Sequence, residues 1–403
     1  MISYTKAITE IKKNIKQSNK KEFVNLSLAI DRILAENIYA NHYSPISNVS
    51  SMDGAIVRKI DLHNNRNRFK IVGESKAGDF STADIKKNET KFVYTGGPVP
   101  GKNKIVIPKE NFKVHLNEKM LEIVLESKTS FIRKKGQDFK INDLCIKKGD
   151  ILNIRKLALA KALKKKELLV LKRPNVVVII SGDEIKSKTN PKGLIESSNK
   201  VLIVNLLNKL GCNTLGVYEV MDNKTELQRV LNSLNNFDFL ITSGGISKGR
   251  YDIIKSTLEN FNLQIIFDSV KVKPGKPVTF GVLNKNKFFL GAPGNPVSCF
   301  ITIIFFFTRM LNSFYGQTKQ IFNYRTLISS SSFKISNKFT NFLRIKLSNS
   351  ENKFYIFKDQ DSSLLKVLSE SDGILVARPK LRTIISGEKY EVILFKDIFN
   401  FWI

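Results

Sequence analysis

Residues 291–298 read Gly-Ala-Pro-Gly-Asn-Pro-Val-Ser and join a strand-like apolar run (288–290) to a helix-like one (296–311). A second loop of small residues, Ser-Gly-Gly-Ile-Ser-Lys-Gly, occupies 243–249 after another strand-like run. Small residues between a strand and a helix offer backbone N–H groups and a helix N-terminus to phosphate-sized anions. The two loops, with Lys273 and Lys276 between them, predict a site for a large anionic small molecule.

The segment around these loops alternates between the two kinds of run. Strand-like runs lie at 175–180, 214–220, 237–242 and 288–290, and helix-like runs at 199–210, 225–234, 252–260 and 296–311. This alternation predicts an open, mostly parallel, doubly wound α/β sheet with helices on both faces. Ligands of such sheets bind outside the carboxyl ends of the strands.

Three carboxylates stand at those strand ends. Glu184 follows the first strand, Asp222 follows the second, and Asp252 opens the helix after the third. A turn or a helix cap explains each residue taken alone, but their coincidence at converging strand ends favours a binding site. Carboxylates repel an anion unless a cation bridges them, and Mg²⁺ binds oxygens of both kinds. We therefore expect Mg²⁺ at Glu184, Asp222 and Asp252, and metal-assisted cleavage of a phosphoanhydride.

The remainder of the chain has a different texture. Helices are expected at 4–17, 27–36 and within 133–172, where 154–163 is amphipathic. Short β-branched runs separated by Gly, Asn and Pro predict a β-rich domain within 50–128 and a smaller one beyond 314. A chain of 403 residues is too long for one ordinary core, so several domains are expected.

Composition excludes several classes of protein. The net charge of +30 suggests a nucleic-acid partner, but the lysines are spread along the chain and no nucleic-acid-binding motif accompanies them. Three dispersed cysteines and three isolated histidines predict neither a disulfide framework nor a zinc site. The polar N-terminus predicts no signal peptide, and Arg309 interrupts the apolar run at 297–311, which predicts a buried helix. A cytoplasmic protein without membrane or nucleic-acid partners is expected.

Two further segments, 50–54 and 95–101, look like hairpin turns when taken alone. As a set, however, the motifs resemble the molybdopterin molybdenumtransferase family (MoeA type, related to the E domain of gephyrin). The order and spacing hold from about residue 25 to about residue 310. The matching pieces are Ser51–Gly54, Gly73–Asp79, Thr95–Gly97 with Pro100-Gly101, Gly136–Asp138, Ser181–Glu184, Ser243–Asp252, Lys273–Pro277 and Pro293–Ser298.

The resemblance implies an elongated chain of several domains. These are a discontinuous helical N-terminal domain (1–45 and 135–172), a β-rich insertion (46–134), a MogA/MoaB-like α/β domain (173–313) and a C-terminal β-barrel-like domain (314–403). It also implies a homodimer whose active cleft joins the α/β domain of one subunit to the β-rich insertion of the other. That cleft would bring Asp53 and Thr95 into the site.

The implied reaction inserts molybdenum from molybdate into adenylylated molybdopterin, with Mg²⁺-dependent hydrolysis of the adenylate and release of AMP. Carried onto this sequence, the catalytic residues are Asp53, Glu184, Asp222 and Asp252. The substrate-binding residues are Thr95, Ser243, Gly244, Gly245, Ser247, Lys273, Lys276, Pro293, Gly294, Asn295 and Pro296. The adenylyltransferase of the same pathway is a further expected partner.

The sequence departs from the family pattern at a few positions. Ala55 stands where an aromatic residue is usual, and Asn103 where Asp is common, so Asn103 is left out of the site. Three alternatives remain at this stage. A molybdopterin adenylyltransferase would consist mainly of the α/β domain, a peptide-binding anchor would tolerate loss of the carboxylates, and a nucleic-acid binder rests on charge alone.

Overall fold

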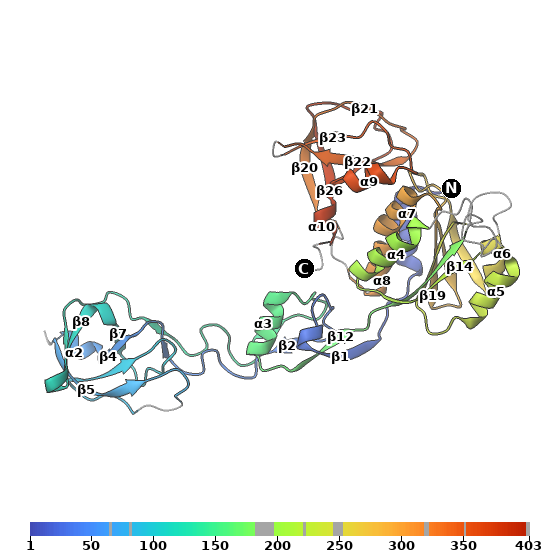
Figure 1. Cartoon of the computed structure of the whole chain (residues 1–403). Helices are drawn as coiled ribbons and strands as arrows, with labels where there is room; N and C mark the ends of the chain where they lie inside the picture. Colours follow the sequence, from blue (N-terminus) through green and yellow to red (C-terminus); the bar gives the residue numbers. More distant parts are fainter. Residues whose placement is uncertain are drawn as a thin grey trace. The chain divides into compact units, whose positions relative to one another are not determined.

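The structure is a computed structural model of the whole chain (Figure 1). It describes residues 1–63, 67–79, 83–181, 197–220, 223–244, 253–317, 322–349 and 352–399. The chain divides into two compact units. Unit 1 comprises residues 1–35, 151–154 and 167–403, and unit 2 comprises residues 36–150 and 155–166.

A twisted sheet forms the centre of unit 1. Its strands, in spatial order, are β14 (Asn213–Val220), β13 (Asn175–Ser181), β15 (Phe239–Ser243), β19 (Lys287–Ala292), β18 (Thr279–Leu283) and β16 (Leu263–Asp268). The first four are parallel to one another, which confirms the predicted α/β sheet. β18 and β16 are antiparallel additions that the sequence analysis did not predict.

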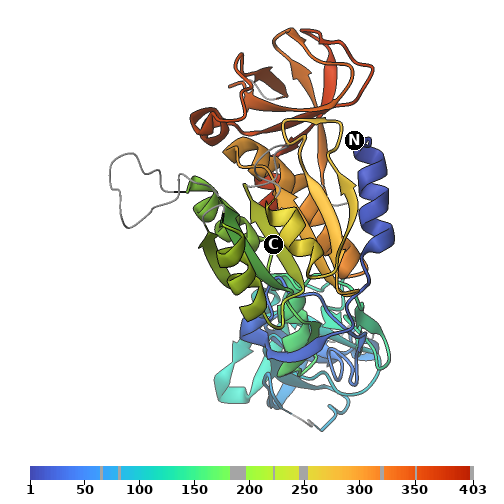
Figure 2. The same ribbon diagram turned by 90° about the vertical axis from the view of Figure 1, so that its right-hand side faces the viewer.

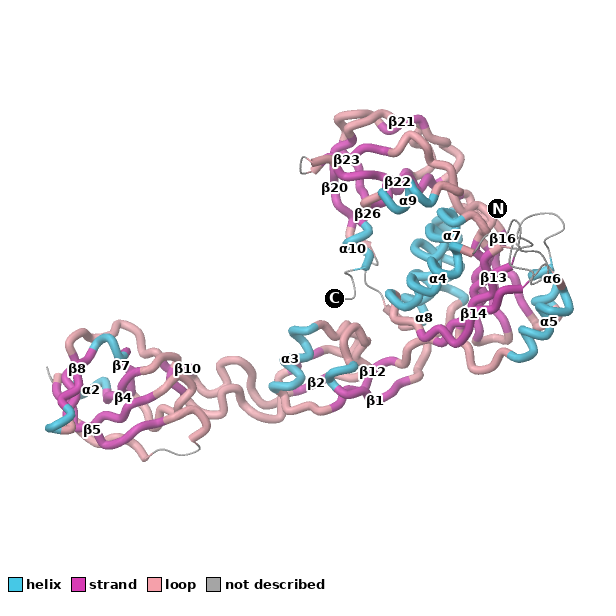
Figure 3. The backbone as a smooth tube through the Cα atoms, in the orientation of Figure 1, coloured by secondary structure: helices cyan, strands magenta, loops and turns pink. Residues whose placement is uncertain are grey.

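Helices cover both faces of this sheet (Figure 3). Alternate residues of a strand point to opposite faces, and the buried side chains of β13 divide accordingly. Val176 and Val178 belong to one apolar cluster, whereas Val177 and Ile179 belong to another. The first cluster includes residues of α1 (Tyr4–Asn14), α4 (Ser198–Lys209), α7 (Pro296–Thr302) and α8 (Thr308–Phe314), and the second includes residues of α5 (Lys224–Ser233) and α6 (Ile253–Glu259).

The apolar run after residue 296 is a core element. α7 continues through a π-helical turn, η4 (Ile303–Phe307), into α8, and the three phenylalanines at 305–307 are fully buried. The helix Pro296–Phe314 is long and apolar enough to cross a membrane, but 83% of it is buried inside the protein. α1, the dark blue helix in Figure 2, packs against α8, and the ring of Tyr4 makes an edge contact with Phe306. The predicted buried helix is confirmed.

The expected helix at 27–36 is wrong. The structure has a short 3₁₀ turn, η1 (Leu26–Leu28), after which Asp31 adopts a left-handed backbone conformation with φ of 61°. A left-handed residue interrupts a helix, so Ile33 and Leu34 form β-bridges to Ile151 and Val170 instead. Within 133–172 the structure has one described α-helix, α3 (Ile154–Ala162), together with β10 (Ile132–Arg133), β11 (Leu144–Ile146) and β12 (Glu167–Leu171). β12 pairs with β1 (Lys21–Asn25), and β10 and β11 pair with β3 (Val49–Ser50) and β2 (Ile38–Tyr39).

The predicted β-rich region forms a sheet in unit 2. Its strands, in spatial order, are β7 (Lys104–Pro108), β4 (Gly54–Arg58), β6 (Glu89–Val93), β5 (Arg68–Ser75), β9 (Met120–Ile123) and β8 (Phe112–His115), with short helices α2 (Lys59–His63), η2 (Lys109–Asn111) and η3 (Leu116–Glu118) between them. Phe69 and Leu121 are fully buried in its core.

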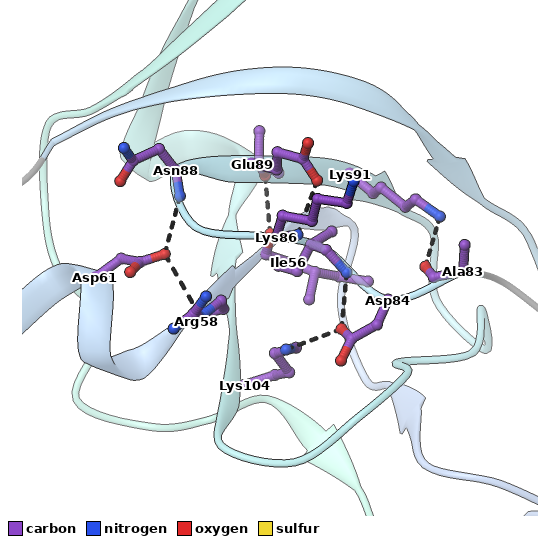
Figure 4. A network of polar contacts seen from close by, with 12 residues as sticks. Ile56, Arg58, Asp61, Ala83, Asp84, Lys86, Asn88, Glu89, Lys91 and Lys104 are labelled. Atoms are coloured by element: carbon purple, nitrogen blue, oxygen red, sulfur yellow. Dashed lines mark hydrogen bonds and ion pairs between the residues drawn. The ribbon is translucent and has the colours of Figure 1, made fainter.

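A polar network fixes the chain that leads into β6 (Figure 4). The ammonium group of Lys104, whose side chain is almost fully buried, pairs with Asp84 at 2.9 Å. The backbone N–H of Asn88 donates to the buried carboxylate of Asp61, which also lies 3.7 Å from Arg58. These contacts join the segment 83–89 to β4, α2 and β7.

The C-terminal part of unit 1 is a closed barrel. Its strands follow the ring β22 (Thr340–Leu347), β23 (Lys353–Ile356), β20 (Tyr324–Ser329), β26 (Lys389–Leu394) and β24 (Gly373–Ala377), which pairs again with β22. β17 (Val272–Lys273) from the α/β region adds to β22 in parallel. The accessory elements are β21 (Phe333–Lys334), β25 (Thr383–Ile384), α9 (Leu365–Glu370) and α10 (Phe395–Phe399). The expected β-barrel-like domain is confirmed.

Candidate functional site

The starts of the two glycine-rich loops, Ser243-Gly244 and Ala292–Gly294, meet at the carboxyl edge of the α/β sheet. Ser243 ends β15, and its buried hydroxyl donates a hydrogen bond to the carbonyl of Pro293 at 3.3 Å. The backbone N–H of Gly244 donates to the carbonyl of Ala292, the last residue of β19, at 3.3 Å. The predicted convergence of these two strand ends is therefore present in the structure.

Glycine is required at the centre of this junction. Gly244 has φ of +85°, and a Cβ added to it would collide with the carbonyl oxygen of Ser181 at the end of β13. A Cβ on Gly294 would lie 3.5 Å from the Cα of Gly244. The backbones after three strands are thus in close contact.

Asn199 is a component of this junction that the sequence analysis missed. It lies in the first turn of α4 and is 7% exposed. Its side-chain N–H₂ donates to the hydroxyl of Ser243 at 2.9 Å and to the carbonyl of Gly294 at 2.6 Å. The available signal was a polar residue in the first turn of a predicted helix that follows a strand-end loop.

The segment 293–296 also contacts the barrel. Pro296 occupies the first turn of α7, and the carbonyl of Asn295 accepts from the backbone N–H of Cys299. The Asn295 side-chain amide donates to the hydroxyl of Ser362 at 2.8 Å, and the carbonyl of Ser362 accepts from Val297 at 3.1 Å. Ser362 was not among the predicted site residues.

Arg344 holds the barrel segment that carries Ser362. This arginine is 1% exposed, and its guanidinium donates to the carbonyls of Asp361 at 2.9 Å and Leu364 at 3.3 Å. Burial lowers the pKa of Arg344, partly offset by the carboxylates of Asp359 and Asp361. The buried guanidinium fixes the loop by donating hydrogen bonds to the carbonyls around it.

The predicted lysines lie on a turn beside α7. Lys273 ends β17 and precedes Pro274 through a cis peptide bond, while Gly275 has φ of +97°. A Cβ on Gly275 would lie 3.5 Å from Thr302 and 3.7 Å from the carbonyl of Ser298, so this turn packs on α7. Lys273 and Lys276 are both exposed and able to meet an anionic ligand.

Asp53 and Thr95 lie together in unit 2, as the resemblance implied. One carboxylate oxygen of Asp53 accepts from the backbone N–H of Thr95 at 2.7 Å and from its hydroxyl at 2.9 Å. These two hydrogen bonds lower the pKa of the exposed Asp53 carboxyl. Asp53 is ionised at neutral pH as an ordinary aspartate is, and the two hydrogen bonds orient its carboxylate.

The glycine motif around 73–79 borders this pair. A Cβ on Gly97 would lie 2.5 Å from the carbonyl of Ser75, whose hydroxyl donates to the carbonyl of Pro98 at 2.7 Å. Glu74 pairs with Lys76 at 2.5 Å. Motifs that are separate in the sequence therefore form one polar surface, defined by residues 53, 74–77 and 94–97.

The other predicted residues, Glu184, Asp222, Asp252, Gly245 and Ser247, lie outside the described residues. Within the described ranges, no group of three His, Cys, Asp or Glu side chains is placed to hold a metal ion. Ser181 and Val220 are register partners at the ends of β13 and β14. The predicted Mg²⁺ ligands Glu184 and Asp222 thus follow neighbouring strand ends by three and two positions.

Comparisons with known proteins show the family of the chain. The family profiles described as MoeA N-terminal region (domain I and II), probable molybdopterin binding domain, and MoeA C-terminal region (domain IV) match residues 2–163, 177–312 and 326–395. A molybdopterin molybdenumtransferase from Haemophilus influenzae is 30% identical over 305 residues, which are 75% of each chain. One from Staphylococcus aureus (strain COL) is 28% identical over 80% of this chain and 78% of its own.

Solved structures show the same fold. A molybdopterin biosynthesis MoeA protein from Pyrococcus horikoshii matches with a TM-score of 0.81 and 25% identity, covering 98% of this chain and 99% of its own. A second structure of such a protein from this organism, strain OT3, matches with a TM-score of 0.82 and 22% identity, covering 98% of this chain and 100% of its own. The chain therefore belongs to the molybdopterin molybdenumtransferase family, transferases of molybdenum cofactor biosynthesis.

Proposed function

We propose that this chain transfers molybdenum from molybdate to adenylylated molybdopterin, hydrolysing the adenylate with Mg²⁺ and releasing AMP. The observation that supports this most strongly is the junction of the strand-end loops. Ser243, Gly244 and Gly294 meet there, beside a turn that carries two exposed lysines. Backbone N–H groups and ammonium groups bind the oxygens of phosphate and of a tetrahedral oxyanion.

The carboxylates supply the second half of the proposed chemistry. Glu184, Asp222 and Asp252 would hold Mg²⁺, which acts as a Lewis acid on phosphate oxygens when bound. Asp53 is oriented by Thr95, and its carboxylate can accept a proton or orient a water molecule. The four carboxylates then act on the anhydride while Lys273 and Lys276 bind the anion.

The protein is further proposed to act as a homodimer whose active cleft combines the α/β region of one subunit with unit 2 of the other. Large apolar side chains are exposed on unit 1, including Phe23 (67%), Leu28 (66%) and Ile154 (71%). Exposed apolar surface of this kind favours an interface between subunits. Light scattering after size-exclusion chromatography tests this: a dimer is expected, and a monomer that is fully active contradicts it.

We further propose a cytoplasmic location and a partner enzyme that supplies the adenylylated substrate. All three cysteines are free thiols, as expected of a cytoplasmic protein. Because the substrate is an adenylylated pterin, the adenylyltransferase that makes it is the proposed partner enzyme. A direct complex between the two is testable by co-sedimentation of the purified proteins.

The decisive experiment incubates the purified protein with adenylylated molybdopterin, Mg²⁺ and molybdate, and follows AMP and active cofactor. Molybdate-dependent AMP release is expected in the wild type and lost in Asp252→Asn. Glu259→Gln is the matched control, because Glu259 is an exposed carboxylate at the end of α6, the helix that follows Asp252. Binding without turnover would support an anchoring role instead, and absence of binding would overturn the proposal.

A further inference from the structure

Asn199 joins three segments that are far apart in the sequence. Its side-chain amide contacts residues 44 and 95 positions away, at the end of β15 and after β19. These hydrogen bonds do not serve α4 itself, because its N-cap residue is Ser197 and that side chain makes no capping hydrogen bond. The side chain of Asn199 therefore donates its hydrogen bonds to the two loops and not to its own helix.

The orientation of the amide follows from its partners. A backbone carbonyl only accepts hydrogen bonds, so the N–H₂ of Asn199 must face Gly294. The hydroxyl of Ser243 accepts a hydrogen bond from the same N–H₂ group and donates one to the carbonyl of Pro293. The result is one directed chain of hydrogen bonds, Asn199 to Ser243 to Pro293, with a second branch to Gly294.

The remaining oxygen of this amide is unusual. The side-chain Oδ1 of Asn199 is buried and has no hydrogen-bond partner in the described part of the chain. A buried acceptor without a partner is unfavourable. The side chain accepts this cost in an orientation that directs its N–H₂ group to both Ser243 and Gly294.

The packing leaves these loops little freedom to move independently. A Cβ on Gly294 would be in van der Waals contact with the Cα of Gly244, and a Cβ on Gly244 would collide with the carbonyl oxygen of Ser181. A side chain that tethers both loops therefore sets the position of each relative to the other. A misplacement of about 1 Å in such a site reduces the rate about 10²-fold.

We propose that Asn199 is a positioning residue of the transfer reaction, which holds the Ser243-Gly244 and Pro293–Pro296 loops at the spacing that the substrate needs. This inference rests on the proposed function, because the loops are the proposed anion-binding elements. Asn199 itself need not touch substrate. Its effect is exerted through Ser243 and Gly294.

The test compares Asn199→Ala and Asn199→Asp with the wild type. Aspartate keeps the shape of asparagine but cannot donate to Gly294, so both variants are expected to lower kcat about 10²-fold at saturating adenylylated molybdopterin. Asn205→Ala is the matched control, since Asn205 lies exposed on the same helix and donates only to the carbonyl of Val201 among described groups. It is expected to keep the wild-type kcat.

Two further readouts separate positioning from a purely structural role. Amide hydrogen exchange of peptides covering 291–299 is expected to accelerate in Asn199→Ala, while peptides from β26 exchange as in the wild type. Ser243→Ala added to Asn199→Ala is expected to lower kcat by less than the product of the two single losses, because the two side chains share one hydrogen bond. Kinetics are measured well below the unfolding temperature, and Asn199→Asp serves in place of Asn199→Ala if the latter does not fold.

The outcomes are distinct from those of the proposed function. An active wild type with variants that keep kcat within about threefold would overturn the positioning role and leave the transferase activity standing. Unchanged exchange at 291–299 would overturn it as well. An inactive wild type would contradict the proposed function, whereas the exchange measurement would still decide whether Asn199 holds the loops.

Discussion

The Asp53–Thr95 pair and the Asn199–Ser243 pair are both hydrogen-bonded contacts at predicted site loops, but their surroundings differ. Asp53 is exposed and charged, and its partners lie on a neighbouring turn of unit 2. Asn199 and Ser243 are buried and neutral, and they connect a helix to two strand ends. A substitution at the exposed pair can change the chemistry of the site without disturbing the fold, whereas a substitution at the buried pair affects both.

This difference follows from the hydration of each group. An exposed carboxylate keeps most of its hydration, so its loss leaves few unpaired partners. A buried hydroxyl or amide has only protein partners, and removing one leaves the other without a hydrogen bond. Substitutions at the exposed pair should therefore change mainly activity, whereas substitutions at the buried pair should lower both activity and stability.

Asp53→Asn is expected to have the largest effect on activity and tests the exposed pair. Loss of the charge is expected to lower cofactor formation by about 10²–10⁴-fold, the usual range for a group that assists proton transfer. The thermal unfolding midpoint, measured by circular dichroism, should fall only slightly, because the contact with Thr95 is exposed. Glu126→Gln, an exposed carboxylate of the same unit, is the control with unchanged activity. An active Asp53→Asn enzyme would remove Asp53 from the catalytic residues.

Ser243→Ala tests the buried side of the comparison. The change removes the acceptor for Asn199 and the donor to Pro293, and it is expected to lower the free energy of unfolding by about 1–3 kcal/mol. Urea denaturation followed by circular dichroism measures this. Ser233→Ala, at an exposed position of α5, removes only a hydrogen bond to the carbonyl of Val230 among described contacts and should change stability less. Equal stability of both variants would show that the buried network is not formed in solution.

The sequence predicted the α/β core well because its signals are local. The Val-Val-Val-Ile-Ile run at 176–180 is apolar on both faces, as a central parallel strand must be, and Gly211 has the left-handed conformation expected at the end of α4. β18 and the edge strand β16 were missed, since no glycine-rich loop directly follows either strand to mark it. The error at 27–36 came from an apolar spacing that suits a helix, which Asp31 interrupts.

The site was predictable only where one stretch of sequence carries the signal. The glycine loops stand out by composition, and the structure brings them together. Asp53 and Thr95 are 42 positions apart, and only the family resemblance associated them. Asn199 and Ser362 acquire their partners through tertiary contacts, so neither spacing nor composition marks them.

Among these substitutions, Thr95→Val is expected to have the smallest effect on activity and stability. It tests the hydrogen bond between Thr95 and Asp53 most directly. The backbone N–H of Thr95 contributes most to the lowered pKa of Asp53, and the hydroxyl contributes next. Valine keeps the first bond and removes the second, so the pKa of Asp53 should rise toward the ordinary value of about 3.9 without reaching it. A lowered pKa means that the contact favours the ionised carboxylate in the folded state. Its stabilising effect is therefore present above the unfolded-state pKa and is lost as the pH falls through the folded-state pKa.

Carbon-13 NMR of the Asp53 carboxyl across the acidic range measures the change. The folded wild type is expected to titrate below Thr95→Val, and the two proteins should differ in stability above about pH 4 and converge at lower pH. Thr129→Val, at an exposed position of the same unit, should leave the titration unchanged. Identical curves for wild type and Thr95→Val would mean that the hydroxyl does not bind the carboxylate, and the orientation of Asp53 would then depend on the backbone N–H alone.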